Sequence, residues 1–250
     1  MTIALQTRSL VKKFGGFVAT NDVSLDVAAG ARHALIGPNG AGKTTLINLL
    51  TGFLAPTSGA VILNGEEVTQ VAQHRRVKRG LARTFQINRL FADMTVLESV
   101  TMAVCEQQGI GARWWKPVGA HGKAVDAAAA LLGQLRLLDV AHERTKDLAY
   151  GKQRLIEIAL ALAAQPTVLL LDEPAAGVPS GESRELFETI AQLPRSVTIV
   201  LIEHDMDLVF RFADTISVLV GGAVLTQGTP AAIADDPRVK EVYLGDAGHG

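Results

Sequence analysis

Residues 37–44 (GPNGAGKT) have the residue types and the spacing needed to bind phosphate groups. They fit the pattern G-x-x-x-x-G-K-[ST] and lie between a strand-like run and a helix-like run. Glycines let backbone N–H groups approach phosphate oxygens, and the following helix directs its positive end at the same anion. We predict a nucleotide-phosphate site in which Lys43 meets the β- and γ-phosphates and the Thr44 hydroxyl coordinates Mg²⁺. The alternative is an ordinary glycine-rich strand-to-helix turn.

Two adjacent carboxylates, Asp172 and Glu173, follow the short apolar run at residues 167–171. In open α/β sheets, ligands bind at the carboxyl ends of the strands. We therefore expect Asp172 to hold Mg²⁺ and Glu173 to polarise the attacking water as a general base. Without a phosphate loop in the same chain, such a pair is often only the solvated start of a loop.

Three more positions carry groups that suit phosphate chemistry. The amide of Gln86 could contact both the metal and the attacking water, and His204, after residues 196–202, could donate to the γ-phosphate. Gly151 lies at the start of a helix-like run, residues 152–164, and so offers a second anion-binding helix end. The alternatives are a surface glutamine, a structural histidine and an ordinary capped helix start.

The elements that position these groups alternate between strand and helix, which indicates an α/β fold. Strand-like runs with little alternation are typical of a parallel sheet buried on both faces, and Gly221-Gly222 predicts a hairpin after the last of them. These strands are expected at residues 32–36, 167–171, 196–202, 216–220 and 223–225. Helices are expected at residues 43–50, 123–138, 152–164 and 182–193.

Two regions depart from this alternation. Residues 3–30 and 60–63 contain short strand-like runs that could form a small antiparallel sheet beside the core. Residues 88–164 are mostly helical and lie between two strand-like runs. We therefore predict one domain, residues 1–250, with a helical insert at about residues 88–164.

The composition excludes several other classes of protein. The chain has 250 residues, 48% of them hydrophobic and 20% charged, which is too apolar for a disordered protein. Its net charge of −1 argues against a dedicated nucleic-acid binder, and a single cysteine, Cys105, excludes an internal disulfide. Because no apolar run approaches the roughly 18 residues needed to span a bilayer, we expect a cytosolic protein that reaches the membrane only through a partner.

The order of these motifs resembles the ATP-binding-cassette (ABC) ATPases along nearly the whole chain. The motifs are the phosphate loop, Gln86, residues 148–153 (LAYGKQ), residues 168–174 and residues 202–205 (IEHD). The resemblance implies a RecA-like core with a mostly parallel sheet, a small antiparallel β subdomain and a helical insert. It also implies that two cassettes pair head to tail, with each ATP held between one phosphate loop and the partner's signature helix.

The resemblance also implies a role for each site residue. Phe14, or Phe17, stacks on the adenine, although Phe14 could be an ordinary aromatic residue of the small sheet. Glu173 is the base, His204 senses the γ-phosphate, and Mg²⁺ is bound by Thr44, Gln86 and Asp172. The remaining contacts to ATP come from Gly37, Asn39, Gly40, Ala41, Gly42, Lys43 and Thr45 in one chain and from Ala149, Tyr150 and Gly151 of the other.

A closer resemblance is to the branched-chain amino-acid uptake group of these ATPases. It is carried by residues 14–16 (FGG), 80–86 (GLARTFQ), 94–98 (MTVLE) and 236–245. It implies an importer subunit at the cytoplasmic face of the inner membrane, with permease subunits, a second cassette and, indirectly, a solute-binding protein as partners. The alternatives are a lipopolysaccharide-export ATPase, a cassette acting in translation or DNA repair, and a phosphate-loop kinase.

Some positions depart from the family pattern or have no single role. Ala149 lacks the usual serine hydroxyl, Lys152 replaces a glutamine, and residues 178–180 (VPS) differ in the loop that meets the partner. Near Gln86, an apolar group either receives a permease helix or packs within the insert; it comprises Ile87, Leu90, Phe91 and Met94. Trp114 and Trp115 either cap that insert or face a partner.

Overall fold

A computed structural model describes residues 2–84, 91–110 and 121–246. It contains two sheets and several helices, and the smaller sheet has the strand order β2-β1-β4-β5. All its neighbouring strands are antiparallel, and β1 and β2 form a long hairpin that turns between Phe14 and Phe17. The strands are β1 (Ile3–Phe14), β2 (Phe17–Ala28), β4 (Ser58–Leu63) and β5 (Glu66–Glu67). The antiparallel sheet expected from residues 3–30 and 60–63 is therefore confirmed.

The larger sheet has six strands in the order β10-β9-β3-β8-β7-β6. All pairs from β9 to β6 are parallel, and β10 runs antiparallel to β9 after a turn at Gly221 and Gly222. Every residue of β3, β7 and β8 is buried, as the uninterrupted apolar runs predicted. The strands are β3 (Arg32–Ile36), β6 (Leu81–Arg83), β7 (Val168–Asp172), β8 (Thr198–Ile202), β9 (Thr215–Val220) and β10 (Ala223–Gly228).

Helix α1 (Lys43–Thr51) lies between the two sheets and shares a core with both. Alternate residues of β7 face opposite sides of the large sheet. Val168 and Leu170 join the core around α1, whereas Leu169 and Leu171 join the core beneath the other helices. The phosphate-loop helix is thus enclosed on both sides, which fixes the loop before it.

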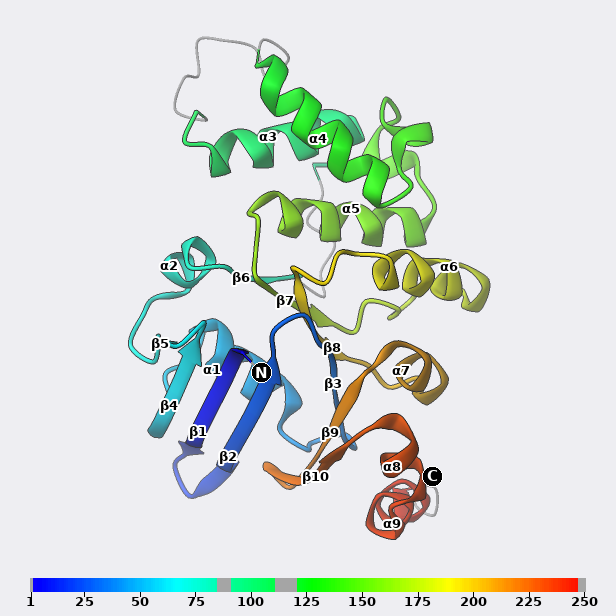
Figure 1. Ribbon diagram of the computed structural model, residues 1–250. Coiled ribbons are helices and arrows are strands. Elements are labelled where there is room, and N and C mark those ends of the chain that lie inside the picture. Colours follow the sequence, from blue (N-terminus) through cyan, green and yellow to red (C-terminus); the bar gives the residue numbers. More distant parts are fainter. Residues whose placement is uncertain (1, 85–90, 111–120, 247–250) are drawn as a thin grey trace.

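Most of the helical chain lies on the other side of the large sheet. Figure 1 shows α5 between this sheet and the outer pair formed by α3 and α4. A capping box starts α3, in which Thr95 and Glu98 satisfy each other's backbone amides. The helices are α2 (Gln73–Lys78), α3 (Val96–Gln107), α4 (Gly122–Gln134), α5 (Tyr150–Ala163), α6 (Ser180–Ala191), α7 (Met206–Phe212), α8 (Pro230–Asp235) and α9 (Pro237–Asp246), with short 3₁₀ turns at Leu138–Val140 and Thr145–Asp147.

The structure differs from the expected elements mainly at their ends. Helix α4 ends at Gln134 rather than at residue 138, because Arg136 takes a left-handed conformation with φ 55°. Helix α5 begins at Tyr150, two residues earlier than expected. The short elements β6, α2, α7, α8 and α9 are additional, and each is too short or too weakly patterned to be predicted from periodicity.

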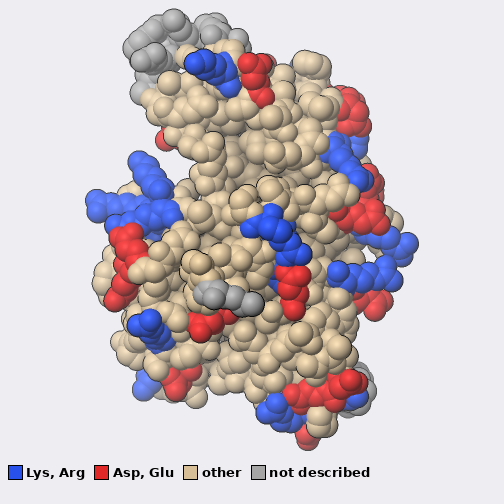
Figure 2. Space-filling model, in the orientation of Figure 1, with Lys and Arg blue, Asp and Glu red and all other residues tan. Residues whose placement is uncertain are grey.

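The surface carries charges of both signs. On the face drawn in Figure 2, Lys and Arg side chains alternate with Asp and Glu, and the outline is indented between the α3–α4 pair and α2. Across residues 2–84, 91–110 and 121–246, no helix combines the length and the apolar character required to cross a membrane.

Candidate nucleotide site

The glycine-rich loop joins β3 to α1 at the carboxyl edge of the large sheet. Gly42 precedes the helix with φ 96°, and a Cβ atom there would lie 2.6 Å from the carbonyl oxygen of Ala19. A side chain would be both strained and obstructed at this position. The loop can therefore lie close against β2 and present its backbone amides at the start of α1.

Lys43 is held in place by the loop itself. The residue is 7% exposed, and its ammonium group donates to the carbonyl oxygens of Gly37 (2.5 Å) and Pro38 (2.9 Å). Burial lowers the pKa of Lys43, and the nearby charges of Glu173 and Asp172 oppose that shift by raising it. The Lys43 ammonium thus lies near both predicted carboxylates, and the two loop carbonyl oxygens accept its hydrogen bonds.

A cleft of about 310 Å³ opens beside the loop. Glu173 and His204 line it, as does Phe17, a residue that is 66% exposed. Phe14 is not part of the lining; the ammonium of Lys12 lies 5.1 Å from its ring centre. The loop contributes Asn39, Gly40, Ala41, Gly42, Lys43, Thr44 and Thr45.

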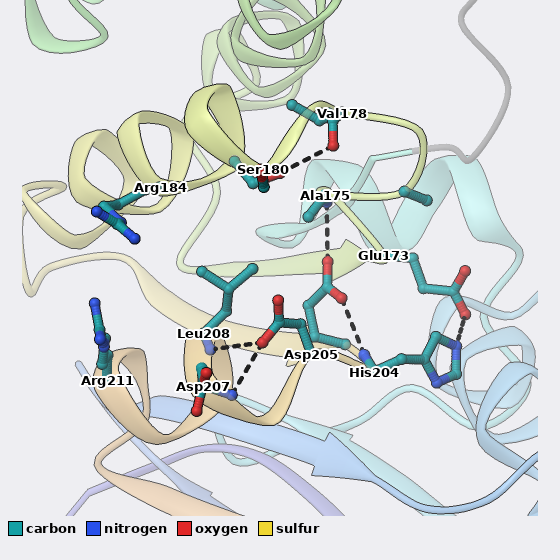
Figure 3. A pocket seen from close by; sticks show the side chains of 13 residues that line it. Glu173, Ala175, Val178, Ser180, Arg184, His204, Asp205, Asp207, Leu208 and Arg211 are labelled. Atoms are coloured by element: carbon teal, nitrogen blue, oxygen red, sulfur yellow. Dashed lines mark hydrogen bonds and ion pairs between the residues drawn. The ribbon is translucent and has the colours of Figure 1, made fainter.

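Glu173 and His204 come together at this cleft. The Nε2 atom of His204 lies 2.5 Å from Oε1 of Glu173. Glu173 has φ 50°, an uncommon conformation outside glycine, and its backbone N–H donates to the carbonyl of Ile202 (2.9 Å). Both side chains also line a second cleft of about 420 Å³. Figure 3 shows them at one end of this second cleft, with Arg184 and Arg211 at the other.

Glu203 joins the loops that follow β7 and β8. Its buried carboxylate accepts hydrogen bonds from the backbone N–H groups of Ala175 and His204, each at 2.9 Å (Figure 3). Burial raises the pKa of Glu203, and these hydrogen bonds oppose the shift. The sequence alone predicts no role for Glu203, although a charged residue directly after an apolar strand is a detectable signal.

Asp172 ends β7 and is nearly inaccessible to solvent. Its Oδ2 atom accepts from Nη2 of Arg83 at 2.6 Å, and Nη1 of Arg83 donates to Oδ1 of Asn48 at 2.7 Å. Gln86 lies outside the described residues, as do Ile87, Leu90, Trp114 and Trp115.

The donor groups suit Mg²⁺ bound together with a nucleotide. Within the part of the chain that the structure describes, three or more His, Cys, Asp or Glu side chains nowhere gather closely enough to bind a metal. Mg²⁺ does not need such a cluster, because it commonly takes one or two protein oxygens, water and substrate phosphates. The exposed hydroxyl of Thr44 and the carboxylate of Asp172 fit that pattern.

The second glycine turn forms the start of α5. Ala149 precedes the helix and provides no side-chain cap, while the N–H of Gly151 donates to Oε2 of Glu182 at 2.9 Å. The hydroxyl of Tyr150 accepts from Nη2 of Arg154 (2.7 Å). In the described chain, the cavity beside Gly151 shares no lining residue with the phosphate cleft. Within one chain, the phosphate loop and the start of α5, both predicted to bind ATP, therefore line separate cavities.

A glycine-rich strand–loop–helix with its lysine, beside carboxylates at the edge of a parallel sheet, defines a phosphate-loop nucleotide-binding protein. Comparison with known families narrows this class. Residues 20–176 match the family described as "ABC transporter", and residues 223–249 match "Branched-chain amino acid ATP-binding cassette transporter".

Individual relatives agree over almost the full length. The chain is 42% identical to the high-affinity branched-chain amino acid transport ATP-binding protein LivG of Escherichia coli K12, covering 97% of this chain and 98% of LivG. It is 41% identical to BraF of Pseudomonas aeruginosa, with the same coverage. The ADP conformation of MJ1267, an ATP-binding cassette of an ABC transporter, superposes with a TM-score of 0.86 at 31% identity, covering 98% of this chain and 100% of that one.

The chain thus belongs to the ABC transporter ATP-binding proteins, in the group related to LivG and BraF. The predicted family and fold class are confirmed.

Proposed function

We propose that this chain binds MgATP at residues 37–44, hydrolyses it, and thereby powers uptake of branched-chain or similar amino acids through membrane permeases. The main support is one cleft that joins the glycine loop, Lys43, Glu173 and His204 in a chain 42% identical to LivG. The name of LivG as a branched-chain amino acid transport protein supports the amino-acid class, and the ADP conformation of MJ1267 supports nucleotide binding in this fold.

Binding begins with an exchange of partners at Lys43. The phosphates replace the carbonyl oxygens of Gly37 and Pro38 as its acceptors, while loop amides and the start of α1 supply further donors. Thr44, Asp172 and Gln86 would hold Mg²⁺, which would neutralise phosphate charge. Phe17, in the cleft lining, and Phe14, across the hairpin turn, are the candidates for stacking on the adenine.

Hydrolysis transfers the γ-phosphoryl group to water. Glu173 accepts a hydrogen bond from the attacking water and receives its proton as the new P–O bond forms. The bond from the γ-phosphorus to the bridging oxygen breaks, leaving ADP and phosphate. His204, in hydrogen-bond contact with Glu173, donates to a γ-phosphate oxygen, and Lys43 stabilises the same charge.

A second cassette completes the site. The start of α5 offers backbone amides at Gly151, but its cavity shares no lining residue with the phosphate cleft in the described chain. This separation supports a head-to-tail pair in which Ala149, Tyr150 and Gly151 of one chain meet the ATP of the other. The partner cassette is either a second copy or a paralogue, and both sit at the cytoplasmic face of the inner membrane on permease subunits.

Changing Glu182 tests this pairing. Its carboxylate accepts from the Gly151 N–H, where the proposed pair would bring the partner's γ-phosphate. We expect Glu182→Gln, in a Glu173→Gln background with ATP, to tighten dimerisation about tenfold by removing one close negative charge. Sedimentation velocity measures the dimer dissociation constant. Glu185→Gln, which lines the same cavity, is the matched control, and a weaker dimer in Glu182→Gln would contradict the pairing.

Phe91 is a candidate contact for a permease. The residue is 50% exposed, and its carbonyl accepts a hydrogen bond from the Thr145 hydroxyl (2.8 Å), which anchors the backbone. Burying a charge at an apolar interface is costly, so Phe91→Asp should abolish most transport while the free subunit keeps its ATPase activity. Vesicle uptake and ATPase assays measure the two effects. Phe53→Asp, at another exposed phenylalanine, is the control; normal uptake by Phe91→Asp would exclude this contact.

Reconstitution tests the transport function directly. The chain is co-purified with a branched-chain amino-acid permease, placed in liposomes with a solute-binding protein for these amino acids, and supplied with ATP inside. We expect leucine, isoleucine or valine uptake that ceases when Lys43 is replaced by alanine. ATP hydrolysis that no branched-chain amino acid stimulates would reject the substrate class and leave the ATPase assignment intact.

A further inference from the structure

A buried ion pair lies directly behind the proposed metal site. Arg83 ends β6, and its guanidinium bonds Asp172 through Nη2 at 2.6 Å, with the two side chains 13% and 2% exposed. Its Nη1 atom donates to Oδ1 of Asn48 at 2.7 Å. One side chain therefore joins three elements: β6, the end of β7, and the phosphate-loop helix α1.

The position of Asn48 on α1 gives this link its importance. Asn48 follows Thr44 by four residues, so both lie on the same face of the helix. Thr44 and Asp172 are the two described side chains proposed to hold Mg²⁺. Arg83 thus connects the carboxylate ligand to the helix face that carries the hydroxyl ligand.

The chemistry of Arg83 suits it to fixing a carboxylate. A guanidinium is planar and has several donors in a rigid arrangement, so two acceptors bound to it are held in a defined relative orientation. Here the two acceptors belong to different elements, Asp172 on β7 and Asn48 on α1. Without this cation, the buried carboxylate of Asp172 would lose its hydrogen-bonded charge partner.

We propose that Arg83 is a positioning residue for Mg²⁺: it orients Asp172 and, through Asn48, aligns that carboxylate with Thr44. The inference rests on the proposed function in that Mg²⁺ binds between Thr44 and Asp172. Groups that hydrogen-bond a metal ligand typically change metal affinity about 10- to 100-fold when removed.

The test measures metal dependence separately from turnover. Binding of a fluorescent ATP analogue to the full-length chain is followed while Mg²⁺ is titrated, and bound Mn²⁺ is counted by electron paramagnetic resonance with ADP present. We expect Arg83→Met to raise the half-saturating Mg²⁺ or Mn²⁺ concentration about tenfold or more. Metal-free affinity for the analogue should remain within about twofold, because Lys43 and the loop amides are unchanged. Arg83→Lys keeps the charge but cannot bond Asp172 and Asn48 in the same fixed geometry. It should recover part of the metal affinity that Arg83→Met loses.

Arg79→Met removes an exposed ion pair with Glu66 and serves as the matched control. If Arg83→Met does not fold, judged by its thermal transition without metal, Asn48→Ala replaces it. In that variant Arg83 keeps its hydrogen bond to Asp172 but loses the one to α1. The half-saturating metal concentration should then rise at least about threefold. An unchanged or lowered metal requirement in the variant that folds would overturn the positioning role. Failure of the unaltered chain to bind the analogue at all would instead overturn the proposed function.

Discussion

Glu173→Gln should bind ATP as tightly as the unaltered chain and hydrolyse it about a hundredfold more slowly, or slower still. The amide keeps the size of the carboxylate and an oxygen that can bond His204, but it cannot take a proton from water. We propose that hydrolysis releases the paired cassettes, so the variant should also accumulate as an ATP-bound dimer. Phosphate release measures turnover, equilibrium binding measures ATP affinity, and sedimentation velocity detects the dimer.

Asp207→Asn is the matched control for this substitution. It removes one exposed carboxylate from the cleft of about 420 Å³ that Glu173 also lines. We expect near-normal turnover from Asp207→Asn, because no step of the proposed reaction uses that side chain. Hydrolysis by Glu173→Gln at the unaltered rate would exclude Glu173 as the base. Loss of ATP binding in that variant would show that Glu173 contributes mainly to binding.

Local sequence patterns predicted the parts of the site that depend on local structure. The glycine loop and Lys43 follow from one motif and its neighbouring elements, and the structure places them between β3 and α1. The sequence predicts Glu173 and His204 just after two strands, and the parallel pairing of β7 with β8 brings them together. Parallel strands end at the same edge of a sheet, so this proximity follows from the fold class.

The contacts that the sequence did not predict join distant segments. Arg83 reaches Asp172, 89 residues away, and Glu182 reaches Gly151, 31 residues away. Arg83 belongs to a three-residue strand that exists only through pairing with β7, and such an element has too little periodicity to be predicted. The sequence also does not decide between Phe14 and Phe17, because the hairpin geometry determines which ring lines the cleft.

Lys43→Ala should lower nucleotide affinity about a hundredfold, because it removes a charge-assisted contact to the phosphates and leaves their charge less compensated. Lys43 is nearly buried and already held by two loop carbonyls, so little conformational entropy is lost when it transfers to phosphate oxygens. Alanine also leaves those two carbonyl acceptors without the ammonium. Isothermal titration with ATP and with ADP measures the loss, which should be larger for ATP because Lys43 also meets the γ-phosphate.

Lys146→Ala is the matched control. It removes an exposed ammonium that pairs with Asp93 at 2.7 Å and should leave the affinities for ATP and ADP unchanged.

Lys43→Arg tests whether charge alone is enough for nucleotide binding. The larger guanidinium keeps the charge but does not fit the donor position enclosed by the Gly37 and Pro38 carbonyls, so nucleotide affinity should stay low. Equal ATP affinity in Lys43→Ala and the unaltered chain would place the nucleotide away from residues 37–44. In that case the Glu173–His204 pair would also need another explanation, because both side chains line the cleft that Lys43 defines.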